Sequence, residues 1–173
     1  IQASDDPAGR KISALFGWLF SDPDSGASLS GVAAVENDAN PVDEGAWQYS
    51  TDNGVNWFNI GSVSDGPAAL ALSGPTRIRF LPVPAFTGSP TTLVVRVMDE
   101  TYVGTMTNGA TRSNVDTSVT GNPSPFSASV VEIETTILPD GTGGNTPPTL
   151  SSVPAAASVG EGSTFSFDAN ASD

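Results

Sequence analysis

Residues 45–61 read GAWQYSTDNGVNWFNIG, and this stretch carries the clearest structural signal in the chain. Its tripeptide 52–54 (DNG) lies between two runs rich in aromatic and β-branched residues, Trp47–Thr51 and Val55–Ile60. Asn-Gly pairs tolerate the positive backbone φ angles that a tight hairpin turn requires. The stretch therefore predicts two antiparallel strands joined at the DNG turn.

Short segments of the same character, separated by Gly and Pro, continue through most of the chain. Further strands are predicted at Leu29–Val35, Ala68–Leu72, Thr76–Val83, Thr91–Asp99 and Ser127–Ile137. Between Ile12 and Phe20, apolar residues recur at i, i+3, i+4 and i+7, which predicts one short helical turn. Many short strands with this spacing are typical of an all-β fold, and we expect a β-sandwich with long apical loops.

The composition excludes several kinds of chemistry. The 173 residues include 19 Asp and Glu, 6 Lys and Arg, and no His or Cys, for a net charge of -13. Without His there is no imidazole base, and without Cys there is no thiolate nucleophile, disulfide or Cys/His zinc site. Nucleic-acid phosphates require clustered Lys and Arg, which this chain lacks. We therefore expect neither an enzyme nor a nucleic-acid-binding protein.

The acidic residues are mostly Asp, and Asp beside Gly and Asn is typical of tight loops lined by oxygen atoms. Ca²⁺ prefers such ligands. The first candidate site is the stretch 22–26 (DPDSG), where Asp22 and Asp24 can converge on one cation. The same stretch is also typical of a turn that is capped by an Asp side chain, so both interpretations stay open.

A second candidate site involves the long connection at residues 100–125, because loops of this length are usually functional or disordered. Asp99 and Glu100 end a predicted strand, and Asn114 and Asp116 lie within the loop. If the loop folds back over the sheet, these oxygens meet at its end. A Ca²⁺ ion there would keep free positions for an anionic ligand. Alternatively, Asp99 is an ordinary strand-end residue and Asn114 a turn residue.

Two other groups of residues are weaker candidates. Glu132 and Glu134 have i, i+2 spacing on one strand, whereas the two carboxylates of a glycosidase usually come from separate elements. We interpret them as the solvent face of an amphipathic strand. The aromatic residues can form a sugar-stacking platform or can serve as core residues. They are Trp18, Trp47, Trp57, Tyr49 and Tyr102.

The predicted organisation is a β-sandwich ligand-binding module at residues 1–139, a linker at 140–148, and the truncated start of another repeat at 149–173. The linker reads DGTGGNTPP, a composition typical of flexible segments. The longest apolar run falls within residues 12–20, well short of the ~20 residues of a membrane span. We therefore expect no membrane insertion, and we interpret the chain as an excerpt of a longer protein.

Several runs resemble a module of giant bacterial RTX-type surface adhesins, and most of all their Ca²⁺-dependent peptide-binding domain. Beside the hairpin stretch, they are residues 9–38 (GRKISALFGWLFSDPDSGASLSGVAAVEND), 76–88 (TRIRFLPVPAFTG), 93–104 (LVVRVMDETYVG) and 114–121 (NVDTSVTG). The resemblance covers about residues 8–138. The tail from residue 147 resembles the opening of a cadherin-like or immunoglobulin-like repeat.

The resemblance implies a β-sandwich with several bound Ca²⁺ ions in an extracellular adhesin on a bacterial surface. Such modules bind the C-terminal ends of proteins on host or neighbouring cells, with one Ca²⁺ coordinating the terminal carboxylate. Carried onto this sequence, Asp99, Asn114 and Asp116 belong to that ligand site, and Asp22 and Asp24 to a structural Ca²⁺ site.

The leading hypothesis is therefore a Ca²⁺-dependent peptide-binding module, in which Tyr102 and Arg112 select the residues before the peptide's terminal carboxylate. Two alternatives remain. One is a spacer domain that Ca²⁺ makes rigid, and the other is a carbohydrate-binding module that uses surface aromatic residues.

Overall fold

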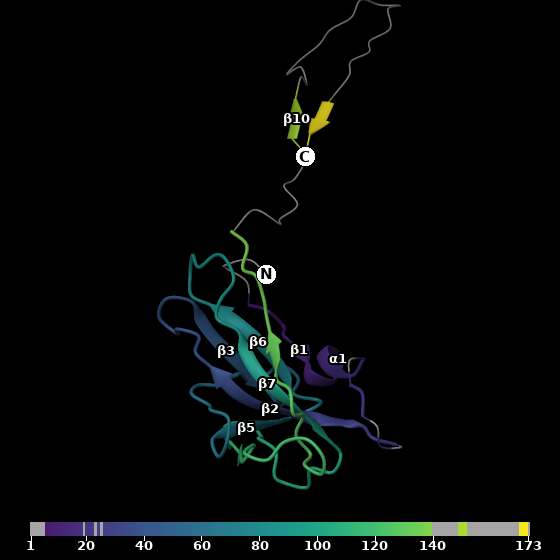
Figure 1. The fold of residues 1–173 in the computed structure, drawn as a ribbon. Coiled ribbons are helices and arrows are strands. Elements are labelled where there is room, and N and C mark those ends of the chain that lie inside the picture. The colour runs from purple at the N-terminus through teal and green to yellow at the C-terminus, as the bar shows by residue number, and fades with distance from the viewer. Residues whose placement is uncertain are drawn as a thin grey trace, which may run out of the picture. The chain divides into compact units, whose positions relative to one another are not determined.

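The computed structural model describes residues 6–18, 20–22, 24, 26–139, 149–151 and 170–172. The chain divides into two compact units, Ile1–Asp140 and Gly141–Asp173. The expected linker at residues 140–148 lies outside the described residues. Of the tail, two antiparallel strands are described, β10 (Thr149–Ser151) and β11 (Asn170–Ser172). The other elements belong to the first unit (Figure 1).

One sheet of the first unit is built around the predicted hairpin. Its strand order is β1 (Arg10–Lys11), β6 (Arg77–Pro82), β3 (Gly45–Ser50) and β4 (Phe58–Asn59). The antiparallel pairing of the hairpin is confirmed, with Tyr49 of β3 opposite Phe58 of β4. The second strand was predicted too long: it covers only Phe58–Asn59 instead of Val55–Ile60, and residues 51–57 form the connection. Asn53 and Gly54 adopt φ angles of 63° and 97°, which explains the Asn-Gly pair at the turn.

The second sheet has five strands and is also antiparallel throughout. Its order is β8 (Asn114–Val115), β5 (Ala69–Ser73), β2 (Leu29–Asn37), β7 (Leu93–Asp99) and β9 (Val131–Ile133). The central strand β2 pairs with β5 on one side and with β7 on the other. Two antiparallel sheets around a shared core confirm the predicted all-β, sandwich-like fold.

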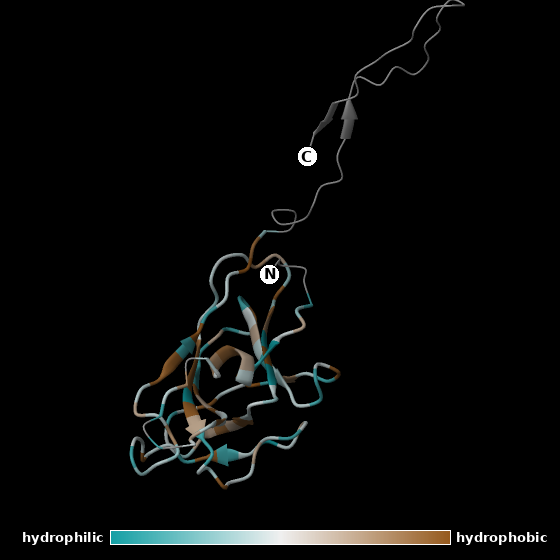
Figure 2. Cartoon of the chain, turned by 90° about the vertical axis from the view of Figure 1, so that its right-hand side faces the viewer, coloured by the Kyte–Doolittle hydropathy of each residue, from teal (hydrophilic) through white to brown (hydrophobic). Residues whose placement is uncertain are grey.

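The main core lies between the two sheets. Val32 and Leu72 come from the five-stranded sheet, and Trp47 and Phe80 from the other. The rings of Trp47 and Phe80 meet edge to face with centroids 5.3 Å apart, and Trp47 Nε1 donates a 2.8 Å hydrogen bond to the carbonyl oxygen of Thr91. Figure 2 shows the apolar residues concentrated on the strands and the short helix.

The outer face of the five-stranded sheet is buried as well. Ala33 and Val35 of β2 belong to a second apolar cluster, which includes Phe126 and is covered by Tyr102 and Met106 of the long loop. Because β2 is buried on both faces from residue 31 to 35, its apolar run does not alternate. Part of the long loop therefore packs on the sheet.

The predicted helical turn is confirmed but short. Helix α1 spans Ile12–Phe16, and both of these residues are buried in the core. Glycine is a poor helix former, and Gly17 follows directly. Trp18 is 77% exposed, and Leu19 lies outside the described residues. In the described part of the chain, no helix is long and apolar enough to cross a membrane.

The strand predicted at Ser127–Ile137 is regular only in β9. At the start of this segment, Nη1 of Arg96 in β7 donates hydrogen bonds to the carbonyl oxygens of Ser127 (3.0 Å) and Ala128 (2.7 Å). Regular pairing with β7 begins only at Val131, opposite Val95. The predicted strand was therefore too long at both ends.

Candidate functional site

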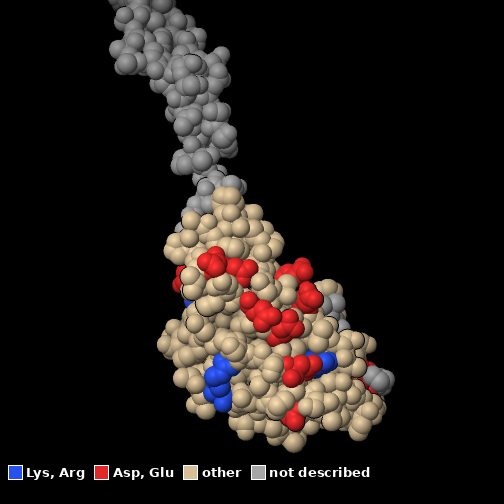
Figure 3. Space-filling view, turned by 60° about the vertical axis from the view of Figure 1, so that its left-hand side comes forward, with Lys and Arg blue, Asp and Glu red and all other residues tan. Residues whose placement is uncertain are grey.

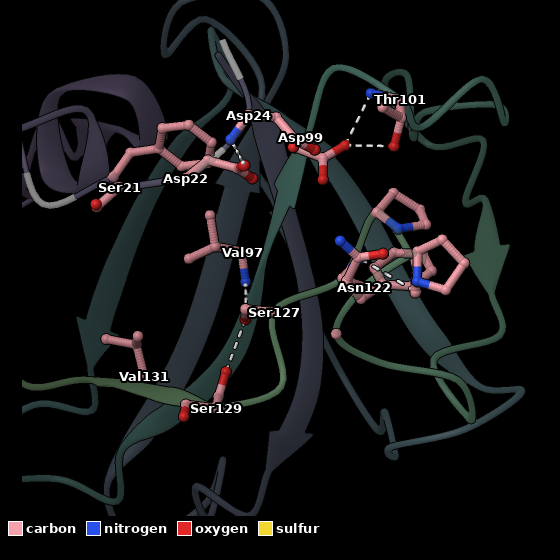
Figure 4. A pocket seen from close by; sticks show the side chains of 16 residues that line it. Ser21, Asp22, Asp24, Val97, Asp99, Thr101, Asn122, Ser127, Ser129 and Val131 are labelled. Atoms are coloured by element: carbon pink, nitrogen blue, oxygen red, sulfur yellow. Dashed lines mark hydrogen bonds between the residues drawn. The ribbon is translucent and has the colours of Figure 1, made fainter. Parts of the chain in front are cut away.

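A pocket of about 590 Å³ lies beside the C-terminal half of β7 (Figure 4). It is bounded by residues 20–22 and 24 after α1, by the end of β7 with Thr101, and by residues 121–127, 129 and 131. Ser127 connects the last segment to β7: its backbone nitrogen donates to Val97 O (2.9 Å), and its Oγ accepts from Val97 N (3.0 Å). The pocket is thus a gap at the sheet edge between two loops.

The lining combines three carboxylates with neutral oxygen groups and an apolar wall. The carboxylates are Asp22, Asp24 and Asp99, which Figure 4 draws at one end of the pocket. The sequence pattern predicts one site at Asp22 and Asp24 and another at Asp99, whereas all three residues line one pocket. The other polar lining residues are Ser21, Thr101, Asn122, Ser124, Ser127 and Ser129, and the larger apolar ones are Phe20, Val97, Phe126 and Val131.

Local hydrogen bonds orient two of these carboxylates. Asp22 Oδ1 accepts from the backbone nitrogen of Asp24 (2.8 Å), which is the Asp-capped turn that the sequence left open. Asp99 Oδ1 accepts from Thr101 N (2.8 Å) and Thr101 Oγ1 (2.5 Å). In both carboxylates, Oδ1 is the atom that accepts these bonds.

Glu100 does not join the pocket lining. Its Oε2 accepts a 2.5 Å hydrogen bond from the backbone nitrogen of Ser28, just before β2 begins. Glu100 therefore fastens the start of the long loop to the segment that leads out of the first acidic turn. Its role is to hold these two segments together.

The predicted convergence of Asn114 with Asp99 is wrong. Asn114 lies in β8, and following the register across β5 and β2 places it level with Ala34 and Val95. It is thus three interstrand spacings of about 4.8 Å and four residues of about 3.4 Å from Asp99, or about 20 Å in all. The reason is that the loop forms the edge strand β8 beside β5 instead of folding over the end of β7.

Asp116 follows β8 and is equally remote from the pocket. Its Oδ1 accepts hydrogen bonds from Ser118 N (2.9 Å) and Ser118 Oγ (2.5 Å), and these bonds lower the pKa of the Asp116 carboxyl. Asp116 thus caps a local turn, and the structure does not place it with Asp99 in a common ligand site.

Tyr102 contributes to the pocket only through a neighbour. Its ring packs against Phe126, a lining residue, with centroids 5.7 Å apart, and its hydroxyl donates to Thr105 O (3.2 Å). Burial raises the pKa of the Tyr102 hydroxyl. Tyr102 therefore supports the apolar wall from behind.

Arg112 lies away from the pocket. Its Nη1 donates to the carbonyl oxygens of Ile60 (2.6 Å) and Asn59 (3.3 Å), at the end of β4. The hydroxyl of nearby Tyr49 donates to Gly109 O (2.9 Å), and its pKa is raised by burial and partly lowered again by the charge of Arg112. Arg112 and Tyr49 together fasten the long loop to the four-stranded sheet.

The aromatic residues form no common platform. Trp47 and Tyr49 are 3% and 1% exposed, which confirms their interpretation as core residues. The ring of Trp57 is covered by the guanidinium of Arg79, 4.0 Å from its centroid. Glu132 and Glu134 are exposed, as expected for the solvent side of a strand.

Sequence reasoning missed the wall at residues 121–129 and the network behind it. Arg96, which holds the carbonyls of this wall, is paired with Asp65, and Thr117 Oγ1 donates to the same carboxylate (2.6 Å). The Arg96 hydrogen bonds are the main reason that the pKa of Asp65 falls to about 2. Only the unusual length of the loop hinted at this region.

The donor types at the pocket fit a hard cation, since Ca²⁺ takes 6–8 oxygen ligands. The spacing of the acidic side chains fits a Ca²⁺ ion less well than the donor types do. Across the described ranges, no three acidic side chains stand close enough together to hold a metal ion between them. On the face of the first unit that Figure 3 shows, acidic side chains predominate over basic ones. A cation here would need neutral oxygens beside Asp22, Asp24 and Asp99.

Comparison with known proteins found no matching family model, no matching curated protein and no matching solved structure.

Proposed function

We propose that this chain is a calcium-dependent peptide-binding module of a bacterial surface adhesin, without enzymatic activity. Its partner would be the free C-terminal end of proteins on host or neighbouring cells. The observation that carries the proposal is the pocket beside β7, where Asp22, Asp24 and Asp99 share one cavity with hydroxyl, amide and apolar groups. The resemblance to RTX-type adhesins supports the same function.

Because no three acidic side chains of the described residues stand close enough to share an ion, Asp99 would hold it with neighbouring hydroxyl, amide and carbonyl oxygens of the pocket, and Asp22 and Asp24 would add negative charge nearby. When bound, Ca²⁺ supplies the positive charge that attracts an anionic ligand group such as a carboxylate. Asn114 of β8 and the following Asp116 lie at the opposite edge of the sheet and are not part of the ligand set of this ion.

The chain's own residues provide the remaining selectivity. Three carboxylates around one cavity repel a peptide carboxylate unless a cation is present. Phe126 and Val131 offer apolar surface to the side chain of the last peptide residue. Tyr102 packs behind Phe126 and so keeps this surface in place. The expected result is a site that binds a C-terminal residue with an apolar side chain.

Calorimetry with matched peptides tests this function. A library of free-acid hexapeptides and its C-terminally amidated counterpart are titrated into the protein, each with excess Ca²⁺ and with EGTA. We expect binding only for free-acid peptides in Ca²⁺, and its loss in Asp99→Asn but not in the matched control Asp116→Asn. Equal binding of the amidated peptides would overturn carboxylate capture.

One observation favours the alternative of a spacer domain made rigid by Ca²⁺. Much of the long loop is used in covering the five-stranded sheet, and Arg112 fastens it to the other sheet. This alternative predicts a higher melting temperature in Ca²⁺ together with no peptide binding in the same titrations.

A further inference from the structure

Strand β9 forms the edge of the five-stranded sheet on the side of the pocket. It pairs with β7 on one side, and within the described ranges no strand pairs with its other side. Val130 and Val131 are 44% and 36% exposed at this edge. An exposed edge with apolar side chains is a template for an additional strand.

The hydrogen bonds of β7 show which backbone groups of β9 point outward. The N–H and C=O of Val97 both bond to Ser127, so they face the β9 side. Val95, two residues earlier, faces the same way and lies opposite Val131. The next residue, Glu132, therefore turns its N–H and C=O away from β7. These groups are available to a ligand.

Side chains along this edge alternate in character. Ile133 packs against the main core, and Val131 lies at the pocket on the same face of the strand. Glu132 and the exposed Glu134 project to the other face. A strand added beside β9 would thus place its side chains alternately next to apolar residues and next to carboxylates. Opposite charges across strands are favourable, so a Lys or Arg suits the position beside Glu132.

The edge is continuous with the pocket, because Val131 and Ser129 line it. The segment that contains β9 runs from the pocket toward Ile133, antiparallel to β7. A peptide antiparallel to β9 would therefore run toward the pocket and bring its C-terminus there.

We propose that the peptide ligand adds to β9 as an antiparallel strand, with a basic residue beside Glu132 and its free C-terminus in the pocket. This inference rests on the proposed peptide-binding function and specifies the ligand: an extended segment that alternates basic and β-branched residues before its carboxyl end. Backbone hydrogen bonds supply affinity in such strand addition, and the alternate side chains supply specificity.

A second copy of this chain fits the edge less well. Antiparallel pairing of two β9 strands would bring Glu132 and Glu134 of one copy close to the same residues of the other. Like charges directly opposite each other are destabilising. Charged residues on an edge strand can also serve only to prevent pairing, and this is the competing outcome of the test.

The experiment uses acetylated free-acid hexapeptides of alternating Thr and Val, with one Lys or one Glu placed at each position in turn, in excess Ca²⁺. We expect the best Lys peptide to bind at least tenfold more tightly than its Glu counterpart. N-methylation of each peptide bond of that Lys peptide should weaken binding about tenfold at alternate positions and little between them. This two-residue period is specific to strand pairing.

Protein variants supply the second arm. Glu132→Pro removes the outward N–H without removing a hydrogen bond to β7, and it should weaken binding about tenfold, whereas Glu132→Gln keeps that N–H. Glu132→Lys should reverse the preference from Lys to Glu peptides. Asp116→Lys makes the same kind of charge change beside β8, at the opposite edge of the sheet, and should leave the preference for Lys peptides unchanged.

The outcomes separate this inference from the proposed function. Alternation in the N-methyl scan without a requirement for Ca²⁺ or a free carboxylate would support strand addition and contradict carboxylate capture. Binding that requires both, but shows no alternation and is unchanged in Glu132→Pro, overturns strand addition alone. A library in which no peptide binds overturns both.

Discussion

Arg96 and Asp65 form a two-point ion pair across the outer face of the five-stranded sheet. Arg96 Nε lies 3.1 Å from Asp65 Oδ1, and Arg96 Nη2 lies 2.6 Å from Asp65 Oδ2. The remaining nitrogen, Nη1, holds the carbonyls of Ser127 and Ala128. One guanidinium thus joins the loop before β5 to the wall of the pocket, and both groups of a bidentate pair are held in a fixed orientation.

The first prediction concerns acid stability. The pKa of Asp65 is lowered from 3.8 to about 2 in the folded protein, mainly by Arg96. The Asp65 carboxyl therefore binds a proton at a higher pH in the unfolded chain than in the folded protein. The pair stabilises the fold fully above pH ~4, and this contribution is lost as the pH falls toward 2. Because the Asp65 side chain is 47% exposed, we expect about 1 kcal/mol.

Urea unfolding of the wild type and of Asp65→Asn between pH 7 and pH 2 measures this contribution. The two stabilities should differ at neutral pH and converge in acid. Asp52 also has a pKa of about 2, but it is unchanged in both proteins and cancels from the difference. A constant difference at all pH values would contradict the prediction.

A second prediction concerns the packing of the long loop. Phe126 is 6% exposed and fills the second apolar cluster, so Phe126→Ala should lower the free energy of unfolding by about 3 kcal/mol. Val103 of the same loop is 96% exposed, and Val103→Ala should change the free energy of unfolding by less than about 0.5 kcal/mol. Denaturant unfolding compares them, and equal effects would contradict the packing argument.

A third prediction separates two roles for Arg112. The resemblance to adhesin modules predicts that Arg112 selects the ligand, whereas its side chain is hydrogen-bonded to the carbonyl oxygens of Ile60 and Asn59. Arg112→Met should therefore lower stability by about 1 kcal/mol through the lost hydrogen bonds and leave peptide affinity unchanged. A selective loss of affinity, measured by calorimetry with stability unaltered, would restore the ligand role.

A fourth prediction concerns the hairpin turn. Gly54 has a φ of 97°, where a side chain is strained, so Gly54→Ala should cost about 1–2 kcal/mol. Val55 is next to it and 79% exposed, which makes Val55→Ala the matched control. Thermal unfolding of the two variants is the measurement, and a neutral Gly54→Ala would show that the turn relaxes.

The fifth prediction follows from the relocated acidic site. If one Ca²⁺ ion binds in the pocket with Asp99 among its ligands, saturation at about 100 times the dissociation constant should stabilise the fold by about 2.7 kcal/mol. Asp99→Asn should reduce this gain, whereas Asp116→Asn should leave it intact. Melting curves with Ca²⁺ and with EGTA give the comparison, and an equal loss in both variants would contradict the relocated site.

Much of the fold could be predicted because it depends on local patterns. The DNG turn fixes where β3 and β4 reverse direction, and the apolar segments at residues 29–35 and 91–99 correspond to the buried strands β2 and β7. The length of the strand at residues 127–137 could not be predicted, because it depends on contacts with β7 that local spacing does not encode.

The candidate site, too, could be predicted only in part. By itself the sequence determined the all-β fold, the acidic excess and the aspartate-bearing loops, since these depend on residue type and short-range spacing. Only the tertiary structure decided which loops meet. The pairing of β8 with β5 carries Asn114 and Asp116 to the far edge of the sheet, and the turn after α1 carries Asp22 and Asp24 to the end of β7 beside Asp99. These pairings join strands that are far apart in the chain, so short-range spacing carries no information about them.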